Sequence, residues 1–307
     1  MRTTATDISD VPDQEARAVA SATPSRWVDF YELTKPRLNF LVVVTTVVGF
    51  YMVARPGTNW IILIHTILGT ALTAAGASVL NQYLERHLDG RMPRTKDRPL
   101  PAGRVSPVEA LAYGVVLGLA GVTYLTFLVN PLTALLGAFT LCSYIFIYTP
   151  AKRWTTLNTV IGAIPGAIPP MMGCVAIQNA ITAEGVALFC ILFLWQMPHF
   201  LAIAILYRDD YAAGGFKMLP VVDPSLETTG RQIVLYGMAL VPASLVPVGL
   251  HMSGAVYFTA AVLLGLAFLS YGISCAVTRT RLDARKLFFA SIIYLPVLLA
   301  AMMVDKT

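Results

Sequence analysis

The chain has 307 residues, of which 56% are hydrophobic and only 13% are charged, and its formal net charge is +5. This apolar fraction excludes an ordinary water-soluble domain, because long apolar stretches at such density are typical of membrane spans. A spanning helix needs about 20 mostly apolar residues, so the sequence predicts an all-α polytopic membrane protein.

Nine predicted spans follow one another along the chain. They cover residues 38–56, 60–82, 108–128, 131–148, 156–177, 184–206, 232–251, 254–277 and 286–304. The preceding segment is polar and lacks the apolar core and small-residue cleavage site of a signal peptide. We therefore predict a flexible cytoplasmic tail over residues 1–35 and a transmembrane domain over residues 36–307.

Basic residues lie almost entirely on one side of this predicted bundle. With a cytoplasmic N-terminus, the tail and the loops after the even-numbered spans contain every Lys and Arg except Arg55 and Lys306. This asymmetry is what the positive-inside rule predicts for cytoplasmic loops. We therefore expect a multi-pass protein of the cell (inner) membrane. The net positive charge then reflects topology, and nucleic acid is not an expected partner.

Three oxygen-bearing side chains follow the second span. Asn81, Glu85 and Asp89 recur every four residues, so on a continuous helix they project from one face, about 6 Å apart along the axis. Carboxylates at the membrane boundary usually mark function, and three oxygen ligands on one face suit Mg²⁺. The alternative is a solvated helix end whose carboxylates face Arg86, Arg91 or water.

A basic loop comes next, and prolines shape it. Its charged members are Arg91, Arg94, Lys96, Arg98 and Arg104, interrupted by Pro93, Pro99, Pro101 and Gly103. Carboxylates and a basic loop can both face one site if a divalent cation and a diphosphate lie between them. The alternative is a loop whose charges only set the topology.

The whole segment NQYLERHLDGRMPRTKDRPLPAGR, residues 81–104, carries a specific resemblance. Its pattern N-x3-E-x3-D-x2-M-x-R-T-x2-R-P-L-P-x-G-R resembles the first acidic motif of the UbiA superfamily of intramembrane prenyltransferases. The central glutamate and the RPLPxGR ending resemble the heme O synthase branch of that superfamily. Every fixed position of the pattern is present.

The loop after the fourth span begins with Tyr148, Lys152 and Arg153. The two cations suit a phosphate or a propionate, or they only set topology. Pro165, Pro169 and Pro170 then interrupt the fifth span, so we predict a kinked or broken helix there; broken helices are tolerated in membranes where they line a cavity.

The segment 195–220 resembles the superfamily's second acidic region. It retains Asp209 and Asp210 but has Tyr207 and Tyr211 where relatives often have aspartate, which puts a second Mg²⁺ site in doubt. Lys217 is a candidate phosphate contact, whereas Arg208 and Asp209 could equally form a surface ion pair.

An intramembrane histidine, His199, lies in the same segment. Such a residue is either a hydrogen-bonded interior group or, with a heme substrate, an axial iron ligand. His65 is a weaker candidate for the second role.

The resemblance implies a helical bundle around a central cavity that opens near the cytoplasmic side. It also implies transfer of the farnesyl group of farnesyl diphosphate to a vinyl group of heme B, with Mg²⁺ as cofactor at Asn81, Glu85 and Asp89. Expected partners are these two substrates, the lipid bilayer and a downstream heme-modifying membrane enzyme. Further catalytic residues would be Arg94, Arg98, Lys152 and Lys217, and further substrate-binding residues Arg104, Tyr148, Arg153, His199, Tyr207, Arg208, Asp209 and Asp210.

Two alternatives share part of this pattern. A UbiA-type enzyme that prenylates an aromatic ring for quinone or chlorophyll synthesis would share the fold and the metal site, but Glu85 and the RPLPxGR ending disfavour it. A secondary transporter would place its ionisable groups near the bilayer midplane, whereas here they gather at the predicted cytoplasmic edge.

Overall fold

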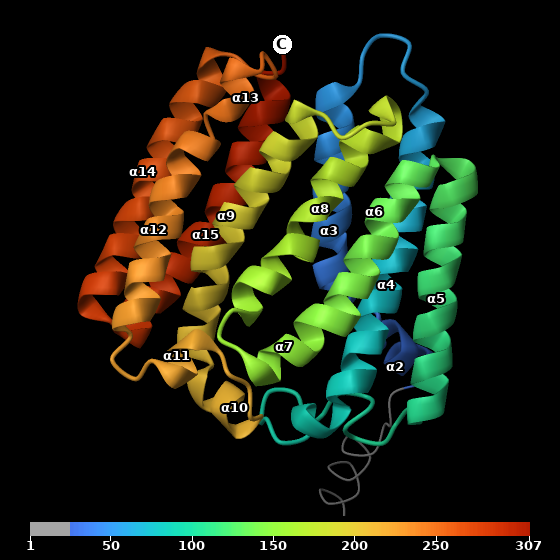
Figure 1. Cartoon of the computed structure of the whole chain (residues 1–307), viewed down its shortest axis with the longest axis vertical. Coiled ribbons are helices and arrows are strands. Elements are labelled where there is room, and N and C mark those ends of the chain that lie inside the picture. The colour runs from blue at the N-terminus through green and yellow to red at the C-terminus, as the bar shows by residue number, and fades with distance from the viewer. Residues whose placement is uncertain (1–24) are drawn as a thin grey trace, which may run out of the picture.

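The computed structural model describes residues 25–307, and these form a helical bundle (Figure 1). The helices are α2 (Arg26–Leu33), α3 (Pro36–Val53), α4 (Trp60–Asp89), α5 (Pro107–Leu128), α6 (Pro131–Cys142), the π-helix η1 (Ser143–Tyr148), α7 (Thr149–Trp154), α8 (Asn158–Gln178), α9 (Ala183–Leu206), α10 (Arg208–Ala213), α11 (Leu219–Val222), α12 (Glu227–Ala243), α13 (Val246–Gly249), α14 (Ala255–Thr278) and α15 (Arg281–Val304). The all-α prediction is confirmed.

Nine segments of the described chain are long and apolar enough to cross a membrane. Each corresponds to one of the nine predicted spans. The fourth span is composite, because α6, η1 and α7 continue one another over Pro131–Trp154. The second extends beyond its predicted end at residue 82 and continues as one helix to Asp89. The chain is therefore a multi-pass membrane protein.

The most enclosed helix of the bundle is α8, which packs against α3 on one side and α9 on the other. Three prolines lie inside α8, at Pro165, Pro169 and Pro170. The helix is nevertheless continuous from Asn158 to Gln178, so of the two predicted alternatives, a kink or a break, the break is wrong. Neighbouring helices can accommodate the backbone groups that proline leaves unpaired within a membrane.

Glycines allow α3 and α8 to approach each other closely. A Cβ atom added at Gly49 would lie 1.9 Å from the carbonyl oxygen of Pro170, and one at Gly173 would lie 2.0 Å from that of Thr46. Small residues at helix contacts are a common device in membranes, where packing rather than water drives helix association. This contact fixes α3, whose N-terminal end enters the site described below.

We expect Gly49→Ala to destabilise the bundle by about 1–3 kcal/mol, because the new methyl group meets backbone that cannot yield without separating α3 from α8. Thermal unfolding of the detergent-solubilised protein measures the effect. Gly249→Ala is the matched control, since no atom lies within 4 Å of a Cβ added there. Equal melting temperatures for the two variants would contradict this account of the contact.

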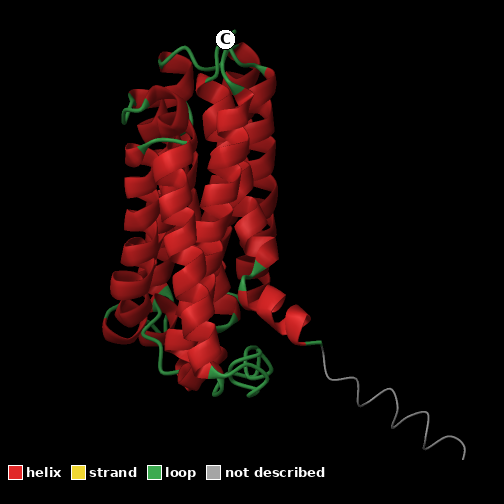
Figure 2. Cartoon of the chain, turned by 90° about the vertical axis from the view of Figure 1, so that its right-hand side faces the viewer, coloured by secondary structure: helices red, strands yellow, loops and turns green. Residues whose placement is uncertain are grey.

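The structure differs from the predicted boundary of the N-terminal tail. Residues 1–24 of that tail lie outside the described residues, but Arg26–Leu33 form α2, which leaves the main bundle at an angle (Figure 2). Leu33 is fully buried and packs with Val79, Leu100 and Val105. The side-chain amide of Gln82 donates a hydrogen bond of 2.7 Å to the carbonyl of Leu33. The folded unit therefore begins before residue 36.

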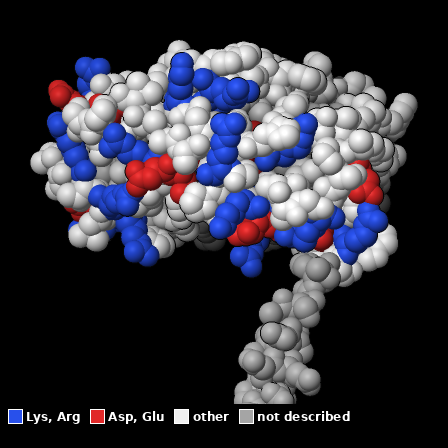
Figure 3. All heavy atoms as spheres, turned by 90° about the horizontal axis from the view of Figure 1, so that it is seen from below, with Lys and Arg blue, Asp and Glu red and all other residues white. Residues whose placement is uncertain are grey.

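Charged residues gather at one end of the bundle. Seen from this end, Lys and Arg side chains are spread over the whole face, with Asp and Glu between them (Figure 3). The chain reaches this end through α2, α7, α10, α11 and the loop after α4, whereas the C-terminus lies at the opposite end (Figure 1). We refer to this face as the charged end.

Candidate active site

The three oxygen-bearing side chains of α4 share one cavity at the charged end. Asn81, Glu85 and Asp89 are almost fully buried, with exposed fractions of 1%, 5% and 2%. All three line a cavity of about 100 Å³. Because α4 continues unbroken to Asp89, their four-residue spacing keeps them on one helical face. We refer to these residues as the oxygen stripe.

Each member of the oxygen stripe has a cationic partner across the cavity. Lys152 Nζ lies 2.8 Å from Glu85 Oε1, and Arg98 donates a hydrogen bond of 2.8 Å to Asp89 Oδ2. Lys35 Nζ donates a hydrogen bond of 3.1 Å to Asn81 Oδ1. Buried charges are tolerated when they are paired and hydrogen-bonded. The cavity therefore combines a column of oxygen ligands with three converging cations.

The loop between α4 and α5 folds back so that its arginines reach this cavity. The Thr95 hydroxyl donates a hydrogen bond of 2.8 Å to the carbonyl of Asp89, which ties the loop to the end of α4. Gly103, with a φ of 72°, makes a turn that a residue with a side chain rarely adopts. Arg94 and Arg98 both line the cavity.

Two tyrosines of the second acidic region contact the same loop. The guanidinium carbon of Arg94 lies 5.0 Å from the ring centroid of Tyr207 and 5.7 Å from that of Tyr211. Both distances are within cation–π range. Tyr211 also lines the cavity. Aromatic rings, rather than additional carboxylates, thus face the oxygen stripe from this region.

The π-helix η1 shapes the opposite wall. It precedes α7 and places Tyr144 and Tyr148 in the cavity lining. Lys152 Nζ lies 4.6 Å from the ring centroid of Tyr148, so the cation rests between an aromatic face and Glu85. The Thr149 hydroxyl donates to the carbonyl of Tyr144 and accepts from the Asn81 amide at 3.1 Å, which turns Asn81 Oδ1 toward Lys35. Short π-helical insertions are frequent at functional sites.

Lys35 is a cavity residue that the sequence interpretation did not identify. By sequence, it is one of the topology-setting cations of the predicted tail. Its backbone is left-handed, with a φ of 48°, and it forms the junction between α2 and α3. Burial, together with the nearby charges of Arg98 and Lys152, lowers the pKa of Lys35 to about 7. The sequence signal that could have identified this junction is the proline directly after Lys35, which begins α3.

Several other predicted site residues lie outside the cavity lining. Arg153 and Lys217 are exposed. Arg208, Asp209 and Asp210 form the first turn of α10, where Asp209 pairs with Arg281 at 2.5 Å on the exposed surface. The alternative of a surface ion pair therefore applies to Asp209, with Arg281 rather than Arg208 as partner. Substrate contacts by these residues stay a prediction.

The intramembrane histidines also lie apart from the oxygen stripe. His199 Nδ1 is 2.6 Å from the Ser291 hydroxyl. Its ring stacks between those of Trp195 and Phe288, with centroid distances of 4.8 and 5.3 Å. His65 Nδ1 is 2.9 Å from the Tyr124 hydroxyl. Each histidine thus has a hydrogen bond in the interior of the bundle, and iron ligation by His199 stays a prediction.

Arg104, predicted to bind substrate, holds α2 in place. Its Nε donates a hydrogen bond of 2.7 Å to Asp29 Oδ1, and its guanidinium also lies 3.5 Å from Glu32. The Asp29 side chain is only 3% exposed. The chain runs from α2 directly to Lys35, which lines the cavity. By holding α2, the ion pair therefore links the end of the RPLPxGR sequence to the position of Lys35.

We expect Arg104→Ala to reduce stability by about 3 kcal/mol, because it leaves the Asp29 carboxylate buried without its cation. The melting temperature in detergent measures this loss. Asp29→Asn in the Arg104→Ala background should restore most of it, since the uncompensated charge is then gone. If Arg104→Ala instead melts like the unmodified protein and only KM rises, the residue binds substrate and the structural role is wrong.

The donor set of the cavity suits a divalent cation that is shared with a substrate. Within residues 25–307, no group of three or more His, Cys, Asp or Glu residues could hold a metal ion, and the oxygen stripe supplies two carboxylates and one amide. Mg²⁺ commonly binds to one or two carboxylates and takes its remaining ligands from phosphate oxygens and water. Lys35, Arg98 and Lys152 could balance the negative charge of such a phosphate.

Comparison with known proteins identifies the family of this chain. A model described as the UbiA prenyltransferase family matches residues 42–293. A protoheme IX farnesyltransferase of Solibacter usitatus is 48% identical over 91% of this chain and 98% of the relative. One of Myxococcus xanthus is 43% identical over 94% of this chain and 98% of the relative.

Solved structures share the fold at low sequence identity. A structure described as digeranylgeranylglyceryl phosphate synthase has a TM-score of 0.76 at 17% identity and covers 91% of this chain and 98% of its own. A UbiA homolog from Archaeoglobus fulgidus bound to GPP and Mg²⁺ has a TM-score of 0.63 at 15% identity, covering 89% and 99%. The family match over most of the sequence and the similarity to full-length relatives show that this chain belongs to the UbiA prenyltransferase family.

Proposed function

We propose that this protein transfers the farnesyl group of farnesyl diphosphate to a vinyl group of heme B. The observation that carries the proposal is the cavity in which an oxygen stripe and three cations face each other at the charged end. The consistent name of the relatives, protoheme IX farnesyltransferase, supports the choice of donor and acceptor.

The chain's own cations would bind the diphosphate and stabilise it as it leaves. The bond between C1 of the farnesyl group and the diphosphate oxygen breaks, and its electron pair stays on that oxygen. Three cations of the cavity can stabilise this growing negative charge: Arg98, Lys152 and Lys35. Fixed charges are most effective where water is excluded. Anionic diphosphate would also keep Lys35 protonated, reversing the effect that burial has on its pKa.

Asn81, Glu85 and Asp89 would hold Mg²⁺, as the Archaeoglobus fulgidus homolog with GPP and Mg²⁺ suggests for the family. When bound, Mg²⁺ supplies electrostatic stabilisation of phosphate oxygens. The three residues are oriented before substrate arrives, because the Asn81 amide is fixed by Thr149 and the two carboxylates are buried. The second acidic region places the rings of Tyr207 and Tyr211, rather than additional carboxylates, beside Arg94. This supports one Mg²⁺ site rather than two.

Aromatic and sulfur-containing side chains would protect the allylic cation. Tyr144, Tyr148 and Phe216 line the cavity together with Met92 and Met218. Aromatic faces attract a cation, and side chains that exclude water from it would keep it from being quenched early. The vinyl electrons of heme B then form the new carbon–carbon bond to C1. Water adds to the resulting porphyrin cation and loses a proton, giving the hydroxyethylfarnesyl side chain.

His199 is our candidate for the axial ligand of heme iron. Its Nδ1 is held by Ser291, which leaves Nε2 as the ring nitrogen that could meet iron. Arg153 is a candidate contact for a phosphate or a heme propionate, and Lys217 is a candidate contact for a phosphate. We further propose that the charged end faces the cytoplasm of a cell (inner) membrane, because basic residues concentrate in the segments at that end.

Incubation of the purified protein with heme B, farnesyl diphosphate and Mg²⁺ tests the proposal. Mass spectrometry should detect heme B that has gained a farnesyl group and a hydroxyl group. A parallel reaction replaces heme B with a phenolic acceptor of the type used in quinone synthesis. Prenylation of the phenol without a heme product would show that the chain is an aromatic prenyltransferase instead.

A further inference from the structure

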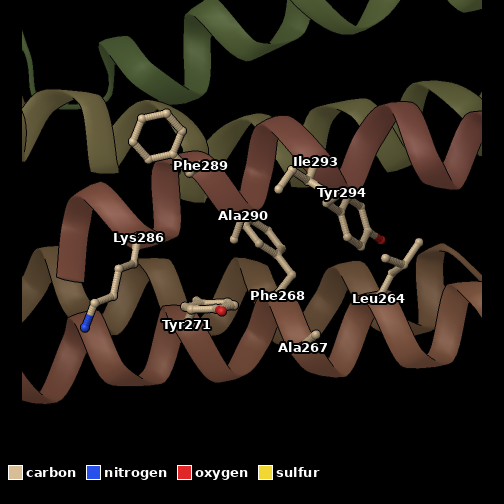
Figure 4. A pocket seen from close by; sticks show the side chains of 9 residues that line it. All are labelled: Leu264, Ala267, Phe268, Tyr271, Lys286, Phe289, Ala290, Ile293 and Tyr294. Atoms are coloured by element: carbon tan, nitrogen blue, oxygen red, sulfur yellow. The ribbon is translucent and has the colours of Figure 1, made fainter. Parts of the chain in front are cut away.

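A second cavity lies on the outer face of the bundle, far along the chain from the oxygen stripe. It is a groove of about 370 Å³ between α14 and α15. Leu264, Ala267 and Phe268 form one wall, and Phe289, Ala290 and Ile293 form the other (Figure 4). Several of these side chains are exposed, among them Ile293 at 61% and Phe289 at 51%. The groove therefore opens toward the lipid.

One end of the groove is positively charged. Lys286 lies beyond Tyr271 at the end of the row of lining side chains (Figure 4). Arg285, the preceding residue, has its guanidinium carbon 5.9 Å from the ring centroid of Phe289, so it flanks the same end. Lys286 pairs with Asp283 at 2.9 Å, but its side chain remains 52% exposed.

The single carboxylate of Asp283 compensates at most one of these two cations. The carboxylate also accepts hydrogen bonds from the Thr278 and Thr280 hydroxyls, at 2.6 and 3.1 Å. These bonds stabilise the start of α15. Asp209, an acidic residue of α10, pairs with Arg281 of the same turn. The turn between α14 and α15 therefore presents net positive charge at the mouth of an apolar groove.

The dimensions of the groove match one lipid chain in one leaflet. From Lys286 to Tyr294, α15 advances about 12 Å at about 1.5 Å per residue. That length is most of one half of a hydrocarbon core about 30 Å thick. The charged mouth lies at the charged end of the bundle, where lipid head groups begin. Tyr271, 43% exposed, presents its ring beside Lys286, and tyrosine is typical of this interfacial depth.

We propose that the groove between α14 and α15 binds an anionic phospholipid, with one acyl chain along the apolar walls and the head-group phosphate at Arg285 and Lys286. The charge at the mouth selects an anionic over a zwitterionic head group. The apolar walls favour a lipid over a free phosphate ion, because only a lipid has an acyl chain that can pack along them. This site is separate from the proposed prenyl-transfer cavity, and neither depends on the other.

Native mass spectrometry of the delipidated full-length protein tests the site. The protein is offered equal amounts of dioleoylphosphatidylglycerol and dioleoylphosphatidylcholine. A basic residue at a membrane surface favours anionic lipid by about fivefold, so we expect retention of phosphatidylglycerol by at least about tenfold over phosphatidylcholine. Arg285→Gln with Lys286→Gln should reduce this preference to about twofold or less.

Arg279→Gln with Arg281→Gln is the matched control. It removes the same charge from the same turn, but Arg279 bonds toward the carbonyl of Ser225 and Arg281 toward Asp209, so neither lines the groove. This control should keep the preference.

Ala267→Trp, which fills the open side of the groove, should reduce retention of both lipids. Equal retention of the two lipids by the unmodified protein, or an unchanged preference in the Arg285 and Lys286 variant, would overturn the proposal. Displacement of the lipid by excess farnesyl diphosphate would also overturn it, because the groove would then be a substrate site.

Discussion

Asp89→Asn should lower kcat for farnesyl transfer by about 10²- to 10³-fold, the usual loss when one preorganised electrostatic contact to a developing charge is removed. Asp89 is the last member of the oxygen stripe and is 2% exposed, so water cannot replace its carboxylate. Its partner Arg98, at 2.8 Å, would also lose the group that orients it. Steady-state kinetics with heme B and farnesyl diphosphate, over a range of Mg²⁺ concentrations, measure the change.

Asp97→Asn is the matched control for this substitution. Asp97 lies in the loop that follows Asp89, is exposed and is no part of the cavity lining, so kcat of this variant should stay within about twofold of the unmodified protein. The Asp89 variant should in addition need more Mg²⁺ for half-maximal rate. Unchanged kcat and unchanged Mg²⁺ dependence in Asp89→Asn would contradict the assignment of the oxygen stripe.

Lys152→Gln is the second change with a large expected effect, a loss of about 10²-fold in kcat. Lys152 lies 2.8 Å from Glu85 and 4.6 Å from the ring centroid of Tyr148, so its charge is held in the cavity rather than in solvent. Without it, the leaving diphosphate would lose one fixed cation at the moment its negative charge grows. Single-turnover rates at saturating substrates isolate this step from binding.

A structural role for Lys152 makes a different prediction. Loss of the cation also leaves Glu85 buried without its partner, which by itself would lower stability. Lys152→Gln with Glu85→Gln removes both charges; it should recover melting temperature but not rate. Lys96→Gln, an exposed cation of the neighbouring loop, controls for net charge. If the double variant recovers the rate as well, Lys152 acts only by neutralising Glu85.

The features that sequence predicted best are those set by local periodicity. Each span is an apolar stretch of helical length, and lipid leaves the backbone few alternatives to a helix. The oxygen stripe follows from the same reasoning, because Asn81, Glu85 and Asp89 share a face only if the helix continues, as α4 does. The resemblance carried by residues 81–104 then identified the family, which the comparisons confirm.

The features that sequence did not predict depend on partners distant along the chain. Arg104 is part of the recognisable motif, but its partner Asp29 lies 75 residues away, so its contact with α2 could not be inferred from spacing. Lys35 had an ordinary interpretation as a topology-setting cation, and only the folded chain brings it to Asn81. The orientation of α10 likewise directs Asp209 to Arg281, whereas Tyr211 lines the cavity.

The π-helix is a fourth feature that the sequence did not predict. The sequence over residues 131–148 predicts an apolar span, and nothing in its periodicity marks the change to π-helical geometry at Ser143–Tyr148. That change brings Tyr144 and Tyr148 into the wall of one cavity, together with Lys152. Local propensity predicts the helix, but the helix's exact path near the site depends on packing against α4 and α8.

The most direct test of the central claim is a structure with Mn²⁺ in place of Mg²⁺ and a non-reactive thio analogue of farnesyl diphosphate. Anomalous scattering should place the ion within coordination distance of Asn81 Oδ1, Glu85 and Asp89, and of the diphosphate oxygens. Lys35, Arg98 and Lys152 should then contact the diphosphate. A structure with the ion and the diphosphate bound elsewhere, while the oxygen stripe keeps its present pairs with Lys152 and Arg98, would contradict the account.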